Sequence, residues 1–399
     1  MMQYLSIIIA VFGVLGSLYF GNARSYPIEM VSILGIWGIL IWCFPKPVLS
    51  LRWLLILAFL LRFPFIWQEP SFSDDLYRYL WEGKAIGLGI NPYLEAPARF
   101  EVMDGIRERV NHPTIPGVYP PLIQLIFWGI GKIYYAPLAW QLVAMFCDLG
   151  ILFGLWKIVA PKDRDLLVFY AIHPLAIIES ASSAHIESVA LLCLVWSVVS
   201  FQRQKDEKWW LFFGGWIKLF PWVYLPFLRG WGWKKITLMF FVSAGLMAPF
   251  WDLEMFFALQ NYARHWQFNA SLFALFYWML PQYARWICFF FGALLYAWVW
   301  WQKFPLPRAM LWIGAGFVLL SPTVHPWYGA WAWIPALMLG NRSWNLFASL
   351  LPLSYIALAT INPETGAWSP PIWPSLLIYT ALLICLLVDF GKQKSLKPS

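Results

Sequence analysis

Two adjacent aspartates, Asp74 and Asp75, open a polar segment that brings acidic, basic and aromatic residues close together. A carboxylate in such a segment can act as general base toward an acceptor hydroxyl, or hold a divalent cation. The alternative is a helix start, with Ser73 as cap and both acids in the first turn. Both can hold, because a capped helix is also a rigid mount for a base. The candidate substrate-binding residues of this segment are Arg78, Tyr79, Glu82, Lys84, Asn91 and Tyr93.

Three later clusters combine histidine with other polar or aromatic residues. They contain His173, Glu179, His185 and Glu187, then Arg264, His265 and Trp266, and finally His325 and Trp327. Ionisable groups at membrane depth are costly, so these residues are functional candidates by default. The alternative is that they pair with one another and hold helices together. His185 and Glu187 could also join Asp74 and Asp75 around Mg or Mn, although no tight ligand spacing supports a metal site.

Several basic side chains are candidates for contact with a phosphate group. Arg264 offers bidentate donors, and its alternative role is contact with lipid headgroups. Lys132 and Arg78 are further candidates for the same phosphate. Lys218 lies on a broken apolar segment, where the alternative is that its long side chain snorkels to the membrane interface.

The composition indicates a membrane protein. Of the 399 residues, 61% are hydrophobic and 12% charged, and the mean hydropathy is +0.63. Soluble domains carry about 25% charged residues, so the composition excludes a soluble domain of ordinary size. The net charge of +8 fits basic cytoplasmic loops near anionic lipids and needs no nucleic-acid partner. All five cysteines lie in apolar runs and are expected to be buried thiols.

Apolar runs of about 17 to 25 residues are candidate membrane spans. We expect spans near 4–20, 28–44, 51–67, 138–159, 166–180, 186–201, 236–252, 285–301, 310–321, 327–339, 344–361 and 372–388. The fold class is therefore all-α, a polytopic helical bundle of about 12–13 spans, with residues 1–399 as one transmembrane domain.

The distribution of Lys and Arg sets the expected orientation, because short cytoplasmic loops collect these residues. Basic loops, among them 202–208, 229–235 and the tail 391–399, are assigned to the cytoplasm. Residues 68–136 then form an outer loop that carries the Asp-Asp motif.

Three ambiguous apolar runs are constrained by this orientation. Parity makes 119–135 an interfacial helix and 209–228 a re-entrant or broken segment. The run 271–280 is too short to cross.

Residues 73–84 (SDDLYRYLWEGK) followed by 89–93 (GINPY) resemble the first outer loop of GT-C glycosyltransferases that use polyprenyl-phosphate sugars, particularly the mannosyltransferase-like bacterial members. Later landmarks in the same order are 118–122 (VYPPL), 173–187, 218–221 (KLFP) and 325–328 (HPWY). The long acidic motif is fairly specific, whereas each later landmark is weak on its own.

The resemblance implies many helices, interfacial helices in the first outer loop and a catalytic aspartate there. Asp75 aligns best with this aspartate and Asp74 second. The family typically has Asp where this chain has Glu82 and often Arg where it has Lys84, which puts a metal role of Glu82 in doubt. The usual donor is a dolichyl- or undecaprenyl-type phosphate sugar, and the reaction inverts the anomeric carbon.

The expected function is therefore transfer of mannose or another hexose from a polyprenyl-phosphate donor to a lipid or glycan acceptor, at the outer face of a bacterial inner membrane. A transporter or flippase of lipid-linked sugars is the alternative, because it too needs intramembrane charges and broken helices. A scaffold subunit is a third reading, but it would not need acids and histidines gathered on one face.

Overall fold

The structure is a computed structural model that describes residues 2–100, 104–228, 230–252, 255–362 and 369–395. Arg229 and Lys397, two of the predicted cytoplasmic basic residues, lie outside these ranges. The secondary-structure elements of the described residues are all helical, and isolated bridge residues, such as the pair Phe268 and Thr323, lie outside them. The predicted all-α class is confirmed, as is the polytopic helical bundle, which several long apolar helices support.

The chain divides into two compact units. The first unit comprises Met1–Pro64, Leu155–Ile178 and Gln267–Ser399, and the second comprises Phe65–Gly154 and Glu179–Trp266. Each unit is assembled from segments far apart in the sequence, so each depends on long-range helix packing.

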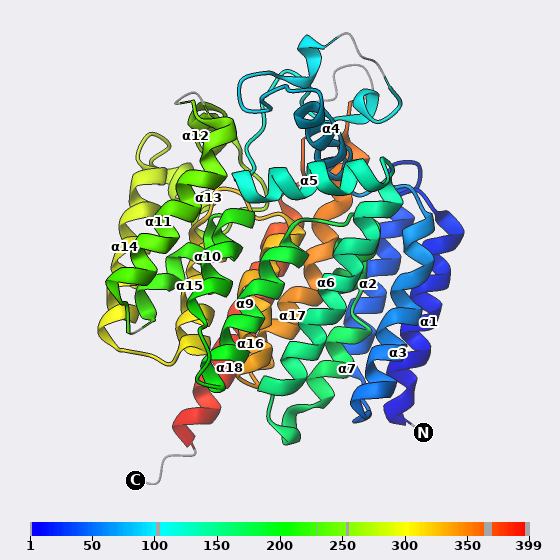
Figure 1. The fold of residues 1–399 in the computed structure, drawn as a ribbon. Coiled ribbons are helices and arrows are strands. Elements are labelled where there is room, and N and C mark those ends of the chain that lie inside the picture. Colours follow the sequence, from blue (N-terminus) through cyan, green and yellow to red (C-terminus); the bar gives the residue numbers. More distant parts are fainter. Residues whose placement is uncertain (1, 101–103, 229, 253–254, 363–368, 396–399) are drawn as a thin grey trace. The chain divides into compact units, whose positions relative to one another are not determined.

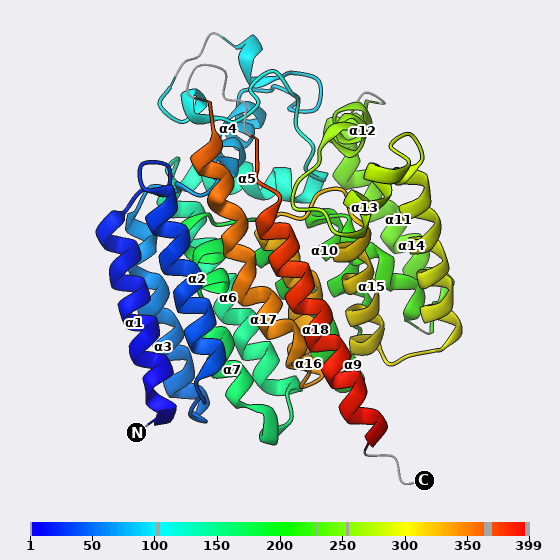
Figure 2. The same ribbon diagram turned by 180° about the vertical axis from the view of Figure 1, so that it is seen from behind.

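The first unit consists of mostly long apolar helices. Its elements are α1 (Met2–Phe20), α2 (Pro27–Cys43), α3 (Leu51–Arg62), η4 (Pro161–Asp163), α7 (Asp165–Ala171), α8 (Pro174–Ile177), α13 (Leu272–Met279), α14 (Ala284–Trp301), α15 (Leu306–Leu320), η8 (Pro326–Gly329), α16 (Ala330–Met338), α17 (Ser343–Leu350), η9 (Leu351–Thr360) and α18 (Trp373–Ser395). Helices α1, α2, α17 and α18 form a row in which each contacts the next (Figure 2). Small residues permit close approach within the row, since Gly38 of α2 faces the backbone of Ser349 on α17.

The second unit carries the polar segment that begins at Asp74. Its elements are α4 (Asp75–Gly87), η2 (Pro97–Arg99), η3 (Arg107–Arg109), α5 (Pro121–Ile133), most of α6 (Pro137–Ile158), η5 (Ile178–Ser182), α9 (Glu187–Gln202), α10 (Lys208–Ile217), η6 (Phe220–Phe227), α11 (Trp233–Met247), η7 (Ala248–Phe250) and α12 (Met255–His265). Helix α5 runs across the direction of α6, and α9 and α10 pack side by side (Figure 1).

Four described helices are long and apolar enough to cross a membrane, and a bent pair of shorter ones makes up to five. They are α1, α6, α14 and residues Trp373–Gly391 of α18, with α7 and Pro174–Ser182 as the pair bent by 51°. Shorter apolar helices account for further predicted spans, and the total of 12–13 stays a prediction.

The ambiguous apolar runs form short or broken helices, as predicted. Helix α5 has 13 residues, and a helix of that length covers about 20 Å of a hydrocarbon core of about 30 Å. Helix α10 ends at Ile217 and η6 begins at Phe220, so the run 209–228 is broken. Helix α13 has 8 residues, too few to cross. The interfacial placement of α5 remains a prediction.

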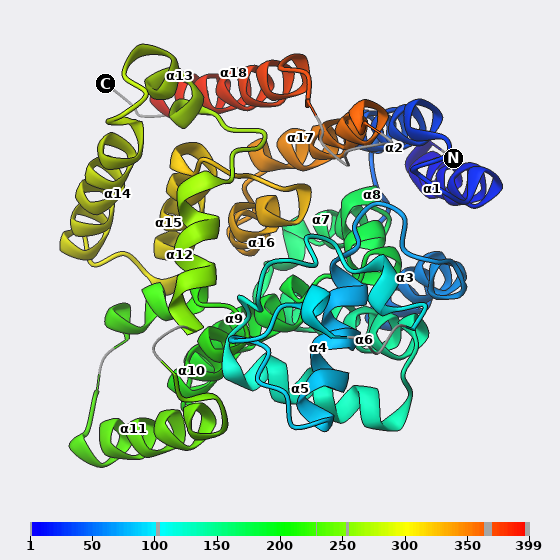
Figure 3. The ribbon, with the colours of Figure 1, turned by 90° about the horizontal axis from the view of Figure 1, so that it is seen from above.

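Helix α4 packs against α5, and this contact positions the acidic motif at the start of α4 (Figure 3). Tyr79 of α4 stacks on Phe127 of α5 with ring centroids 4.8 Å apart. Gly83 permits the approach, because a Cβ there would lie 2.4 Å from the carbonyl oxygen of Phe127. The aromatic stack and the glycine together hold α4 directly against the α5 backbone.

Candidate active site

Asp75 is the first residue of α4, and Asp74 takes the N-cap position. The backbone N–H of Asp75 donates to Ser73 Oγ at 3.3 Å, so the predicted helix start is present one residue later than expected. The Asp75 side chain is 22% exposed, so the carboxylate remains accessible to a substrate.

Both oxygens of Asp75 face polar groups from distant parts of the second unit. The Asn111 amide donates to Oδ1 at 2.8 Å. On the other side, His185 Nε2 lies 3.9 Å from Oδ2, and His185 Nδ1 lies 2.9 Å from Glu179 Oε2. His185 is fully buried. Asp75 therefore lies together with Glu179 and His185, which belong to a different predicted cluster of the sequence.

The guanidinium group of Arg78 holds the loop that carries Asn111. It donates to the carbonyl oxygens of Asn111 and His112 at 2.8 Å each and to that of Ile115 at 3.1 Å. Its remaining N–H groups reach Asn111 Oδ1 at 3.3 Å and Glu82 Oε1 at 3.2 Å. All five N–H donors are thus engaged within the described chain. Because Arg78 occupies the amide oxygen of Asn111, the amide nitrogen is directed to Asp75.

Glu82 is buried between α4 and α5. Its second oxygen accepts from Gln124 Nε2 at 2.6 Å, and its side chain is fully shielded from solvent. Burial raises the pKa of Glu82, and the nearby Arg78 charge and the Gln124 hydrogen bond oppose that rise. The group braces the two helices. Asn111 and Gln124 were missed from the sequence, because lone amides in apolar or irregular segments give no periodic signal.

Tyr79, Asn91 and Tyr93 are also engaged in internal packing. Tyr79 is 1% exposed and lies among aromatic rings of α5 and α6. Asn91 donates to the Phe250 carbonyl oxygen and accepts from the Tyr93 N–H, while the Tyr93 hydroxyl donates to the Tyr119 carbonyl oxygen.

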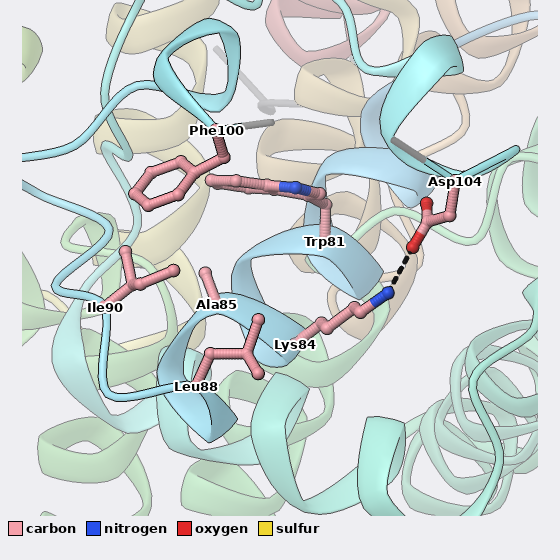
Figure 4. Close-up of a pocket in the computed structure, with 7 residues that line it drawn as sticks. All are labelled: Trp81, Lys84, Ala85, Leu88, Ile90, Phe100 and Asp104. Carbon is pink, nitrogen blue, oxygen red and sulfur yellow. Dashed lines mark hydrogen bonds and ion pairs between the residues drawn. The ribbon is translucent and has the colours of Figure 1, made fainter. Parts of the chain in front are cut away.

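Lys84 pairs with Asp104 at the edge of a small pocket (Figure 4). Trp81 and Phe100 form another part of the wall. The pocket has a volume of about 10 Å³. A single water needs about 10–15 Å³, so the pocket does not hold a sugar.

The other charged candidates of the second unit lie in different surroundings. Lys218 forms an ion pair with Glu187, which gives its side chain a partner. Lys132 is exposed above the Trp128 ring at 4.4 Å. Arg264 and His265 end α12 and are exposed.

Trp266 follows α12 and contacts the loop that Arg78 holds. The rings of Trp266 and His112 meet edge to face at 4.9 Å. The predicted cluster of Arg264, His265 and Trp266 thereby touches the loop that carries Asn111.

His173, His325 and Trp327 belong to the first unit. His173 is fully buried, its Nδ1 accepts from the Leu175 N–H at the start of α8, and its Nε2 lies 3.2 Å from Ser349 Oγ. His325 stacks on Trp327 with centroids 4.5 Å apart. The bonding of His173 matches the alternative in which an imidazole holds helices together.

No group of three or more His, Cys, Asp or Glu side chains in the described ranges is arranged to hold a metal ion. The predicted metal ligands His185 and Glu187 have different partners. His185 faces Asp75 and Glu179, whereas Glu187 pairs with Lys218. The described residues therefore supply carboxylate, imidazole and amide groups around Asp75, an arrangement suited to moving a proton.

Comparison with known proteins gives a family that fits this arrangement. Residues 26–250, more than half of the chain, match the family described as alpha-(1->6)-mannopyranosyltransferase, N-terminal domain. The matched range contains Asp75, Asn111, Glu179 and His185. No curated protein and no solved structure matches the chain. The chain belongs to the alpha-(1->6)-mannopyranosyltransferase family, a GT-C type family of membrane glycosyltransferases.

Proposed function

We propose that the protein transfers mannose, or another hexose, from a polyprenyl-phosphate donor to a hydroxyl of a lipid or glycan acceptor. The reaction takes place at the outer face of a bacterial inner membrane, with Asp75 as general base. The observation that carries this proposal is the Asp75 carboxylate itself. It is partly exposed, it begins a helix packed on α5, and Asn111 holds one of its oxygens.

The family name adds stereochemistry to the proposal. An alpha-(1->6) product requires a primary hydroxyl on C6 of the acceptor sugar. If the transfer inverts the anomeric carbon, an alpha product requires a donor in the beta configuration. Asp75 removes the proton of the acceptor hydroxyl as its oxygen bonds to C1, and the C1–O bond to phosphate breaks with the electron pair on phosphate. The phosphate is a good leaving group, so no strong acid is needed on that side.

Exposed basic groups of the second unit are the proposed contacts of the lipid phosphate. Arg264 and Lys132 are both exposed, and the guanidinium group offers bidentate donors. Arg78 is better suited to positioning the loop that carries Asn111. Four of its hydrogen bonds go to that loop, and one goes to Glu82 of α4. Trp266, which touches this loop, is proposed to position the sugar by ring contact.

The central test compares Asp75→Asn with the wild type in purified, reconstituted protein. The substrates are labelled polyprenyl-phosphate mannose and a mannose-containing glycan. General base catalysis contributes about 10²- to 10⁴-fold, and we expect a loss of kcat in that range. Asp74→Asn in parallel tests the second-best aligned aspartate and should reduce turnover less.

Asp206→Asn is the matched control. Asp206 lies in the same unit as Asp75 but far from the acidic motif in the sequence, and it pairs with Lys235. It should leave transfer unchanged. Near-normal turnover by a well-folded Asp75→Asn protein would refute the base assignment.

A further inference from the structure

We propose that His185 and Glu179 act as a pair on Asp75, with His185 positioning the carboxylate and taking over the proton that it removes from the acceptor. This inference rests on the proposed function and extends its proton path into the buried part of the second unit.

We assign the imidazole hydrogen to Nδ1 from the two contacts of the ring. Nδ1 lies 2.9 Å from Glu179 Oε2, and Nε2 lies 3.9 Å from Asp75 Oδ2. An ionised carboxylate only accepts hydrogen bonds, so Nδ1–H is the donor to Glu179. The lone pair of neutral His185 is then on Nε2, the nitrogen that faces Asp75.

Asp75 is the most exposed of the three side chains, and His185 is the least exposed. The Asp75 side chain is 22% exposed, that of His185 is 0% exposed and that of Glu179 is 10% exposed. Asp75 can therefore meet a substrate, whereas His185 is reached through Asp75.

The turn that carries the pair has a specific backbone geometry. Ala184 has a φ of 52°, a conformation unusual for a residue with a Cβ. The His185 N–H donates to the Glu179 carbonyl oxygen at 2.9 Å, which closes the turn. Side chains of α6 hold it, since Gln141 donates to the Ser182 carbonyl oxygen and Trp140 to that of Ala184. These bonds fix the backbone of the turn, and the contact of Nδ1 with Glu179 Oε2 orients the imidazole.

Asn111 fixes Asp75 from the opposite side. Its amide occupies Oδ1, which leaves Oδ2 as the oxygen facing His185. The 3.9 Å between Oδ2 and Nε2 exceeds a hydrogen bond of about 2.7–3.2 Å. Proton transfer therefore requires the protonated Asp75 side chain to turn toward the imidazole.

Each transfer passes one proton through these groups, and the proton returns through Asp75 to water after the products leave. The acceptor O–H bond breaks, and its proton goes to Asp75 Oδ2 as the new C1–O bond forms. The Oδ2–H bond then breaks and Nε2–H forms, which restores the Asp75 carboxylate. The resulting imidazolium lies between two carboxylates, and that arrangement stabilises its charge.

The main test is His185→Asn, whose amide can still donate to Glu179 but lacks a basic nitrogen facing Asp75. We expect kcat for mannosyl transfer to fall about 10²-fold, with KM for donor and acceptor and the melting temperature unchanged. In His185→Gly, added imidazole should restore part of kcat, and it should restore none in Asp75→Asn. A merely structural histidine would not give this pattern.

A second variant keeps the proposal testable if His185 variants fold poorly. Glu179→Gln can still accept from Nδ1 but removes the charge, and kcat should fall with KM unchanged. Glu69→Gln is its control, since Glu69 pairs with Arg109 on the surface of the same unit.

The outcomes separate the two proposals. A wild-type protein that transfers neither mannose nor another hexose would overturn the proposed function and this inference with it. An active wild type together with a folded His185→Asn protein of normal kcat would overturn the pair alone. So would a loss confined to KM or to thermal stability, without rescue by imidazole.

Discussion

At the scale of single residues, Asn111 links Arg78 to Asp75 through hydrogen bonds to both side chains. Its amide oxygen accepts from Arg78 Nε and its amide nitrogen donates to Asp75 Oδ1. A hydrogen bond to a charged group contributes about 1.5–3 kcal/mol. If the bond orients the carboxylate during the reaction, we expect Asn111→Ala to lower kcat about 10- to 100-fold. Steady-state kinetics of the reconstituted protein would measure this, and an unchanged kcat would remove Asn111 from the positioning groups.

The ion pair of Lys84 with Asp104 predicts a pH effect on stability. Burial raises the pKa of Asp104, but hydrogen bonds from the Lys84 ammonium and the Arg107 N–H outweigh it, so the pKa lies below its ordinary 3.8. A lowered folded-state pKa gives stability that is present above the unfolded-state pKa and lost as the pH falls through the folded-state pKa.

Asp104→Asn should therefore be less stable than the wild type at neutral pH. The difference should be less than about 1 kcal/mol, because the pair is partly exposed and screened by solvent. It should vanish in acid, below the folded-state pKa. Melting temperatures of both proteins over a pH series would check this, and a difference that persists in acid would contradict it.

Single residues at the site were easier to identify from the sequence than their pairings. Asp75, Glu179 and His185 stand out as acids and imidazoles in an apolar chain. The partnership of His185 with Glu179 depends on the turn around Ala184, whose positive φ no local pattern indicated. Glu187 begins α9 and pairs with Lys218, a contact between residues 31 positions apart.

At the scale of elements, the close contact of α4 and α5 rests on Gly83. A Cβ at this position would lie 2.4 Å from the Phe127 carbonyl oxygen and 2.5 Å from its carbon, both backbone atoms. Overpacking of this kind costs about 1–3 kcal/mol, so Gly83→Ala should lower the melting temperature and also lower kcat by displacing Asp75. Differential scanning fluorimetry and the transfer assay would measure both effects.

Gly87 provides the matched control at the end of the same helix. Its added Cβ would lie 3.5 Å from the Trp128 ring, an ordinary van der Waals contact. Ala in place of Gly favours a helix by about 0.5–1 kcal/mol, so Gly87→Ala should be neutral or stabilising. Equal destabilisation by both substitutions would show that the α4–α5 contact is not the cause.

The ends of helices were predictable where residues close in the sequence determine them. The run 209–228 contains Gly214, Gly215, Pro221 and Pro226, and its helix ends at Ile217. The start of α4 followed from Ser73 and the two acids. The packing of Gly83 on Phe127 was not predictable, because it joins two elements through the absence of a side chain.

At the scale of the whole molecule, composition was enough to predict the class. A chain with 61% hydrophobic and 12% charged residues cannot form a soluble core of ordinary kind, and its described residues form apolar helices. The exact number of spans did not follow, since several apolar helices have fewer residues than a straight crossing needs. Broken helices satisfy their backbone groups through neighbouring segments, which a hydropathy pattern does not reveal.

The orientation of the chain is the last consequence of its charge distribution. Lys and Arg in short loops predict that 202–208 is cytoplasmic and that the acidic motif belongs to an outer loop, residues 68–136. Glu108 and Lys205 are both exposed and represent the two sides. In a background lacking the five native cysteines, Glu108→Cys should react with a membrane-impermeant maleimide added to intact cells with a permeabilised outer membrane. Lys205→Cys should react only after the inner membrane is opened. If both cysteines react from the same side, the outer placement of Asp75 fails, and polyprenyl-phosphate mannose would have to be used at the cytoplasmic face.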